Sequence, residues 1–442
     1  MPTSYRPYMP EQGMLLPMSL AEWLPEDHLA YFVSDAVDAL DLRAFHARYE
    51  GDGRRRQPFD PRMMVKLLIY GYASGVFSSR KMARKLHEDV ALRMLCANNY
   101  PAHRTIREFR QLHLKEFSEL FVQVVKLAQE AGLVGLGRVG VDGTKIRANA
   151  SKHKAMSYAR MQDEEARLKR EIAGLLKHAE DQDQADEDHH GPDDPNGGLP
   201  QELKRREDRL KVIEAAKARI EERQRQADKA EARYVDEAGV TRAMGGRRVT
   251  REYGVPEPKA QDNFTDPDSR IMPTASGGFE QCYNGQVAVD EGSQLILAAQ
   301  LINTPSENAL LLPMVDQLEC NTGLRPQMLL ADTNYASEST FIGLEARGVA
   351  ACVALGKEDK QRAIRSALPA TRRMAQRLVT PEGRAHYRRR KIIPEPVFGW
   401  IKHVIGFRTF SLRGLQAASA EWRLICTAMN LKRMHRLGWM LG

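Results

Sequence analysis

The feature that most constrains the fold is a long, highly charged segment that lies between two strand-like runs. From about residue 153 to 235 the composition shifts to Glu, Lys, Arg, Gln and Ala. The run from Val139 to Val141 before it, and "NGQVAVDEGSQLILAAQLIN" (284–303) after it, have the residue pattern of strands. A charged helical segment cannot lie within a sheet, so we expect an insertion into an α/β domain.

The inserted segment carries two narrow apolar seams with helical spacing. Between them, "EDQDQADEDHHGPDDPNGG" (180–198) is acidic and closes with strong turn residues. Narrow seams of this kind suit coiled-coil packing, which predicts an antiparallel helical hairpin. The seams consist of Met161, Leu168, Ile172 and Leu175, and of Leu203, Leu210, Ile213 and Ile220.

Residues 1–135 have the periodicity of helices. "DPRMMVKLLIYGYASG" has a dense apolar stripe, "SSRKMARKLHED" begins with serines suited to capping, and "PAHRTIREFRQLHLKEFSELFVQVVKLAQEAG" predicts one long helix. Cations recur at spacings of three and four, which place them on one face of each helix. That pattern fits a helix-turn-helix-like unit on DNA, and it also fits a solvated surface. These cations are Arg80, Lys81, Arg84 and Lys85, followed by Arg104, Arg107 and Arg110.

The sequence after residue 280 alternates between strand and helix patterns. The turn "DEG" joins two strand runs into a hairpin. Thr304, Pro305 and Glu307 then match a capping box at a helix start, with Pro313 expected to kink that helix. "QMLLADTNY" predicts a buried strand, "SESTFIGLEARG" a helix and "VAACVALG" a further strand, before a basic linker.

Three carboxylates occupy comparable places in this pattern. Asp142 and Asp332 end apolar strands, and Glu395 stands between Pro394 and Pro396 at a predicted helix start. Reacting groups in open α/β sheets gather beyond the strand ends, and carboxylates are ligands for Mg²⁺. Two such ions roughly 3.5–4 Å apart support in-line phosphoryl displacement. The alternative is structural: aspartates at strand ends form turns and caps, and a first-turn glutamate complements the helix dipole.

Composition narrows the class of protein. The 442 residues are sufficient for two to four domains, and the net charge of +8 with a pI near 9.1 favours a polyanionic partner. The five cysteines are scattered without a C-x-x-C pair, which argues against a disulfide framework and a structural zinc site. The sequence has no signal peptide and no apolar run of about 18 residues, so we expect a cytoplasmic protein that does not enter a membrane.

Four blocks of the sequence together resemble a known family. They are "VGVDGTKIRANAS" (139–151), "TDPDSRIM" (265–272), "LLADTNYAS" (329–337) and "YRRRKIIPEPVFGWIKHVIGFRTFSLRG" (387–414). In this order they resemble the DDE transposases of bacterial insertion sequences, over about residues 15 to 435. The branch is the one whose last block carries Tyr, Arg, Glu and Lys, and insertion-sequence family eleven-eighty-two is similar. Tyr387, Arg390, Glu395 and Lys402 take the signature positions, with Arg390 to Glu395 one residue longer than the commonest spacing.

The resemblance implies an α/β fold with an RNase H-like catalytic domain, in which helices flank a mixed sheet. The catalytic domain comprises residues 136–152 and 261–442, the insertion 153–260, and an all-α DNA-binding domain residues 1–135. Asp142 on the first strand, Asp332 after the fourth and Glu395 on the last helix would hold two Mg²⁺ or Mn²⁺ ions. Tyr387, Arg390 and Lys402 would hold DNA phosphate; Lys402 is seven residues after Glu395 (402 − 395), two helical turns on.

The implied activity is cleavage at transposon ends and joining of the freed 3′-hydroxyl to target DNA. The partners are then the terminal inverted repeats and target DNA, with a homodimer or larger assembly on DNA, in the bacterial cytoplasm and at the nucleoid. A nuclease without strand transfer shares the carboxylates, and a catalytically silent transposase-derived DNA-binding protein shares the fold. A coiled-coil scaffold would have no use for the strands after residue 280.

Other residues have competing interpretations. Asp266 and Asp268 are expected to form a turn or a DNA-contacting loop rather than bind metal. Glu421 competes with Glu395 as the third carboxylate, although its segment has the pattern of an apolar terminal helix. Phe398 and Trp400 suit the core, or base stacking if they are exposed.

Overall fold

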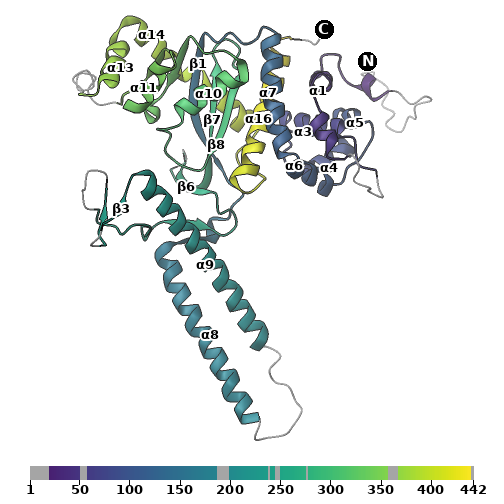
Figure 1. Cartoon of the computed structure of the whole chain (residues 1–442). Coiled ribbons are helices and arrows are strands. Elements are labelled where there is room, and N and C mark those ends of the chain that lie inside the picture. The colour runs from purple at the N-terminus through teal and green to yellow at the C-terminus, as the bar shows by residue number, and fades with distance from the viewer. Residues whose placement is uncertain are drawn as a thin grey trace, which may run out of the picture.

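The computed structural model of the chain describes residues 19–49, 57–186, 199–236, 239–243, 249–274, 277–356 and 367–439. Figure 1 shows a central sheet with helices packed around it, a group of small helices beside the N-terminus, and a long pair of helices that projects away from the body. The turn predicted for residues 180–198 lies largely outside the described part of the chain.

The central sheet is mixed and has six strands in the order β10-β9-β1-β7-β6, with β8 also paired to β7. β1 pairs antiparallel with β7 and parallel with β9, and β9 pairs parallel with β10. β7 and β8 form the predicted hairpin. The strands are β1 (Arg138–Arg147), β6 (Arg270–Pro273), β7 (Phe279–Asp290), β8 (Ile296–Ile302), β9 (Met328–Ala331) and β10 (Ala351–Val353).

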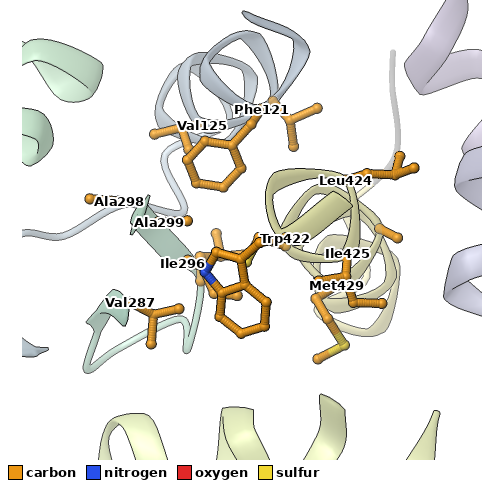
Figure 2. Packing of buried hydrophobic residues seen from close by; sticks show 14 of the residues in the cluster. Phe121, Val125, Val287, Ile296, Ala298, Ala299, Trp422, Leu424, Ile425 and Met429 are labelled. Carbon is orange, nitrogen blue, oxygen red and sulfur yellow. The ribbon is translucent and has the colours of Figure 1, made fainter. Parts of the chain in front are cut away.

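Helices α7 (Leu114–Glu130) and α16 (Leu415–Arg436) lie side by side against the sheet (Figure 1). Figure 2 shows their shared core, where Trp422 of α16 lies between the sheet and α7. The Trp422 indole N–H donates to the carbonyl of Gln286 at 3.2 Å. Gly285 gives this ring its space, since a Cβ there would lie 2.8 Å from the Trp422 Cζ2 atom. The backbone of β7 therefore packs directly on the indole.

Helices before α7 form a compact cluster in the N-terminal region. They are α1 (Leu29–Asp38), α2 (Arg43–Ala47), α3 (Pro61–Ala73), α4 (Ser79–Glu88), α5 (Val90–Leu95) and α6 (His103–Leu112), after a 3-10 turn, η1 (Leu20–Trp23). Ser78 caps α4 as its serines predict, and Asp60 caps α3 with Pro61 in its first turn. The segment predicted as one long helix breaks at His113 into α6 and α7, where His113 has φ −104° and ψ 35°.

A buried charge network joins this cluster to α16. Arg110 is 4 % exposed and Glu421 is 1 % exposed, with Arg110 Nη1 3.7 Å from Glu421 Oε1. Tyr72 lies between them: its hydroxyl donates to Glu421 Oε1 at 2.6 Å, and Arg110 Nη1 donates to the Tyr72 oxygen at 2.6 Å. Glu421 Oε2 also accepts from the backbone N–H of Ser411 and Leu412. The prediction of Arg110 as a DNA contact is wrong in this structure, because its guanidinium is engaged in this buried network.

The insertion is built on α8 (Tyr158–Asp186) and α9 (Leu199–Ala230), which form the predicted helical hairpin (Figure 1). Its core joins the start of α8 to the second half of α9 and includes Met156, Tyr158, Met161, Leu168, Ile213, Ala216 and Ile220. Ion pairs flank this seam, such as Glu165 with Lys217 at 2.8 Å and Glu171 with Arg206 at 2.9 Å.

Short strands close the base of the insertion. β2 (Ala155–Ser157) pairs antiparallel with β5 (Gln261–Asn263), so the chain enters and leaves the insertion at adjacent points. β3 (Tyr234–Val235) pairs with β4 (Thr241–Arg242) between α9 and that base. The insertion thus lies between β1 and β7, the first two long strands of the sheet.

The C-terminal half differs from the predicted pattern at two places. α10 begins at Leu311 with no side-chain cap, so the capping box at Thr304 and Glu307 is wrong, and Pro313 sits in the first turn rather than at a kink. The predicted basic linker contains two helices, α13 (Pro369–Val379) and α14 (Pro381–Arg389). The remaining elements are α10 (Leu311–Thr322), η3 (Thr333–Tyr335), α11 (Glu338–Ala346), η4 (Arg390–Ile392), α15 (Pro394–Gly399) and the π-helical turn η5 (Trp400–Val404).

No helix in the described ranges combines the length and the apolar character that a bilayer crossing needs.

The buried network gives a test of how the N-terminal cluster is held. Arg110→Met leaves the Glu421 carboxylate buried without its cation, so we expect a loss of stability of about 3–5 kcal/mol and a lower midpoint of thermal unfolding. Arg107→Met, three residues earlier on the exposed side of α6, should change stability by no more than about 0.5 kcal/mol. Adding Glu421→Gln to Arg110→Met should restore part of the loss. Equal midpoints for the two single variants would contradict the network.

Candidate active site

Asp142 lies within β1 rather than at its end. The parallel pairing of β1 with β9 ends at Gly140 opposite Leu330, whereas the antiparallel pairing with β7 continues to Arg147. Because β9 ends at Ala331, β1 has an open edge from Val141 onward. The predicted strand end was therefore wrong for β1 itself, but Asp142 does lie where its parallel neighbour ends.

Asp332 directly follows β9 and is level with Asp142. Continuing the register from Gly140 opposite Leu330 by two residues places Asp142 opposite Asp332. Asp332 also caps the short turn η3, where its Oδ1 accepts from the backbone N–H of Asn334 at 2.8 Å. Its other oxygen, Oδ2, is 3.8 Å from Nη1 of Arg390. The cap and the ion pair fix the direction of this carboxylate.

Both aspartates line one cavity of about 870 Å³ along the open edge of β1. Asp142, Asp332 and Glu307 lie towards the end of β9, whereas the cations, together with Glu280, lie towards the far end of β1. The lining comprises Asp142, Gly143, Thr144, Lys145, Arg147, Pro273, Thr274, Glu280, Cys282, Asn284, Glu307, Asp332, Asn334, Lys402, His403 and Arg408. The cavity therefore presents opposite charges at its two ends.

The pKa of Asp142 is raised from 3.8 to about 6. Burial is the largest cause, because it disfavours the charged form, while a 2.8 Å hydrogen bond from the Gly143 N–H opposes it. The negative charges of Asp332 and Glu307 raise the pKa further, and Arg390 lowers it. Carboxylates crowded in this way are stabilised in the ionised form by a bound cation.

Glu307 was assigned to a helix cap from the sequence, and the structure places it in this cavity. It is 6 % exposed, and its Oε1 accepts from Asn284 Nδ2 at 2.7 Å and from Gln286 Nε2 at 3.0 Å. The Tyr335 hydroxyl donates to Gln286 Oε1. Two amides at alternate positions of the otherwise apolar strand "YNGQVAV" were the signal that a buried polar partner exists.

This network contacts both aspartate-bearing segments. Tyr335 is in η3, the turn that Asp332 caps, and Gly143 follows Asp142. A Cβ on Gly143 would lie 2.4 Å from Glu307 Oε1 and 2.1 Å from Gln286 Nε2, so only glycine fits there. Glu307 and Gln286 thus hold the two segments at a fixed separation.

Glu395 is in the first turn of α15, as its prolines predict, and its side chain is exposed. The preceding residues pack on β1, since a Cβ at Gly140 would lie 2.9 Å from atoms of Ile393 and Pro394. The α15 start therefore lies beside β1 close to Asp142, but Glu395 is not in the cavity lining. The structure brings together two of the three predicted carboxylates.

The residues in the cavity fit a divalent cation in chemistry. Carboxylate and amide oxygens are hard ligands, and the buried Asn284 Oδ1 accepts no hydrogen bond. Across the described residues, however, no three Asp, Glu, His or Cys side chains are close enough to enclose an ion. Asp142 and Asp332 are the pair that would hold it, with Glu307 and Asn284 beside them.

Of the signature residues, Lys402 lines the cavity and Arg390 contacts the lining residue Asp332, whereas Tyr387 and Glu395 are outside the lining. Tyr387 is near the end of α14, and the guanidinium carbon of Arg390 lies 5.7 Å from the centre of its ring. Lys402 lines the cavity from the π-helical turn, and burial lowers the pKa of its ammonium. The wider turn rotates Lys402 away from the position that an α-helix would give it relative to Glu395.

The N-terminal cations other than Arg110 lie on the surface of α4 and α6. Arg80, Lys81, Arg84, Arg104 and Arg107 lie at the surface, and Lys85 is half-buried. Arg84 is 3.4 Å from Glu88 and Arg107 is 3.7 Å from Glu108, so both retain weak local partners.

The competing carboxylates have structural roles. Asp266 Oδ1 accepts from the Tyr283 hydroxyl at 2.8 Å and from Gly414 N–H at 3.1 Å. Asp268 Oδ2 accepts from Leu415 N–H at 2.8 Å, at the start of α16. These bonds support the interpretation of Asp266 and Asp268 as turn residues. Glu421 lies in the buried network with Arg110, away from the cavity lining.

The raised pKa of Asp142 predicts a pH-dependent effect of Asp142→Asn on metal-free protein. Because the folded pKa of about 6 exceeds the ordinary 3.8, ionisation of Asp142 costs stability as pH rises from about 4 to 6. The variant should unfold at a higher temperature than wild type above pH 6, and the difference should shrink towards pH 4. Asp316→Asn is the control with opposite sign, since Arg347 lowers the pKa of that carboxyl. A pH-independent difference for Asp142→Asn would contradict the assignment.

The Glu307 network gives a second prediction. Glu307→Leu removes the acceptor of two amides, and we expect a loss of roughly 2–6 kcal/mol, at about 1–3 kcal/mol for each of the two orphaned donors. Glu307→Gln keeps a carbonyl acceptor and should lose less. Glu319→Leu on the surface of α10, which breaks an ion pair with Arg325, should cost at most about 1 kcal/mol. Thermal unfolding measures all three, and equal losses in the two leucine variants would show that the hydrogen bonds of Glu307 do not contribute to stability.

Comparison with known families identifies two regions of the chain. The family "Transposase domain (DUF772)" matches residues 18–112, and the family "Transposase DDE domain" matches residues 259–431. Neither the curated proteins nor the solved structures gave a match. The first region covers the N-terminal helical cluster, and the second covers the chain from the insertion base to α16. The mixed sheet flanked by helices is consistent with the RNase H-like fold. The chain thus resembles transposases over two regions, and the second of these matches a DDE domain.

Proposed function

We propose that this protein is an insertion-sequence transposase, which cuts DNA at the ends of its element and joins the freed 3′-hydroxyl to target DNA. The observation that carries the proposal is the meeting of Asp142 and Asp332, level on β1 and after β9, in a cavity with cations at its other end. The resemblance of the four sequence blocks supports, as part of this proposal, a member of the branch with the Tyr, Arg, Glu and Lys signature that is similar to insertion-sequence family eleven-eighty-two.

The residues of the chain have separate tasks in this proposal. Asp142 and Asp332 present their carboxylates at the scissile phosphate, and Arg390 beside Asp332 offsets charge on that phosphate. Lys402 and Tyr387 bind flanking phosphate. Divalent ions such as Mg²⁺ or Mn²⁺, when bound, supply charge stabilisation and an activated nucleophile for in-line displacement. A side-chain nucleophile is not needed.

In this proposal Glu395 becomes the third ligand of the divalent ions after its side chain rotates towards Asp142. The α15 backbone is already beside β1 near Asp142, and the exposed Glu395 side chain has rotamers open to it. Arg80, Lys81, Arg84, Lys85, Arg104 and Arg107 are the proposed contacts with the terminal repeats. Two ends must be held at once, so we propose a homodimer or larger assembly on DNA, with the α8–α9 hairpin as a candidate contact.

Cleavage of a duplex that bears the element's own ends tests the proposal. With Mg²⁺ or Mn²⁺, wild type and Asp316→Asn should cut, whereas Asp332→Asn should bind equally and lose at least about 100-fold in cutting, because one cation ligand is gone. Glu395→Gln should behave like Asp332→Asn. Binding is measured alongside at a fixed salt concentration.

Each other outcome has a definite meaning. Binding by all variants without cutting in either metal would favour a silent DNA-binding protein. Cutting without joined products would favour a nuclease. Equal cutting by wild type and Asp332→Asn would show that Asp332 does not hold the ion.

A further inference from the structure

We propose that the far end of the cavity binds DNA backbone phosphates about three to five nucleotides from the scissile one. The binding surface, here called the basic rim, consists of Lys145, Arg147, Lys402 and Arg408. Lys402 belongs to the sequence signature, whereas the other three cations are assigned here for the first time. The inference rests on the proposed function, because it takes the acidic end as the point of cleavage.

The open edge of β1 sets the geometry of the rim. From Val141 onward β1 has no parallel neighbour, until Arg147 meets the segment after η5. There Arg147 N–H donates to the Arg408 carbonyl at 3.2 Å, and Phe410 N–H donates to the Arg147 carbonyl at 2.9 Å. The cavity thus runs from the end of β9 to this second pairing, with acids at one end and cations at the other.

One of these cations, Arg408, is held in place before any ligand binds. Arg408 Nε donates to the Lys402 carbonyl at 2.9 Å, and Arg408 Nη2 lies 3.0 Å from His403 Nδ1. Lys145 and Arg147 are two residues apart on a strand, so both side chains leave the same face of β1. A pre-positioned Arg408 loses less conformational entropy on binding than a side chain without such contacts.

The charges of the basic rim are not balanced by ion pairs within the described part of the chain. In the part of the chain that the structure describes, none of its four cations forms an ion pair within 4 Å, unlike Arg206 or Arg219 in the insertion. Arg147 and Arg408 are exposed, and Glu280 is the one carboxylate in this part of the lining. Crowded cations without counter-charges favour a polyanion, and evenly spaced phosphates supply it.

The spacing along β1 gives the expected register on DNA. Lys145 and Arg147 lie three and five residues after Asp142 (145 − 142 and 147 − 142), or about 10 and 16 Å along the strand axis at about 3.3 Å per residue. Because these offsets are odd, their side chains leave the face of β1 opposite to that of Asp142, and the cavity reaches both faces across the open edge of the strand. A DNA strand advances about 3.4 Å per nucleotide along the duplex axis, so these distances correspond to about three to five nucleotides.

A scan with neutral methylphosphonate linkages tests the register. Single linkages are placed one to seven nucleotides on each side of the cut, in each strand of a transposon end and in a target duplex. Binding by wild type, Arg147→Ala/Arg408→Ala and Lys126→Ala is measured for each DNA. Lys126 is an exposed cation on α7, outside the cavity. The side and the duplex on which sensitivity appears distinguish the transposon end from the target as the source of the phosphates.

We expect neutral linkages about three to five nucleotides on one side to weaken wild-type binding roughly tenfold, the effect of one charge-assisted hydrogen bond. The same linkages should have little effect on Arg147→Ala/Arg408→Ala. The salt slope of that variant should fall by about 0.9 for each phosphate that the protein no longer neutralises. Lys126→Ala should behave like wild type.

Other results overturn the inference. A double variant as sensitive as wild type at every position would show that the rim does not bind phosphate. Sensitivity confined to the linkage at the cut would show that the strand does not reach the rim. Binding does not require cleavage, so a wild type that binds with this coupling but never cuts would refute the proposed function and leave the rim intact.

Discussion

The two different neighbours of β1 are the constraint on which the site depends. Its antiparallel pairing with β7 extends along the whole strand, but its parallel pairing with β9 stops at Gly140. That difference creates an open edge inside a sheet that is otherwise covered by α7 and α16. Asp142 and Asp332 are level because both lie two residues beyond the last pair of the shorter pairing, Gly140 opposite Leu330. A shift of one residue in that register would turn Asp142 to the opposite face of the sheet.

Much of the fold followed from sequence because its strands are strongly patterned. The hairpin of β7 and β8, the strand before Asp332 and the inserted helical hairpin were all predicted from periodicity and turn residues. The break at His113 was not, since the apolar pattern continues across it. The strand predicted at Val139 to Val141 ended too early, because Thr144, Lys145 and Arg147 are polar. Only their pairing with β7 makes this segment part of the strand.

Side-chain roles were harder to predict than elements. Arg104, Arg107 and Arg110 share a spacing of three, but each step turns back by about 60° on a helix of 3.6 residues per turn, so Arg110 is rotated by about 120° from Arg104. That rotation brings Arg110 against Tyr72 and Glu421. Glu307 met the rule for a cap, yet Asn284 and Gln286 of another element determine its place. Asp332 could be placed from the sequence because it directly follows a buried strand, whereas Asp142 lies within β1, where the predicted strand end was wrong.

The insertion affects how the central sheet forms. β1 and β7 pair across more than a hundred residues, as in Val139 opposite Asp290, and such a distant pairing is slow to close in an unstructured chain. The pairing of Ala155 with Asn263 brings the ends of the insertion together. Once α8 and α9 have folded on each other, β7 meets β1 across a short gap instead of a long loop. A longer or shorter hairpin would therefore leave unchanged the register that aligns Asp142 with Asp332.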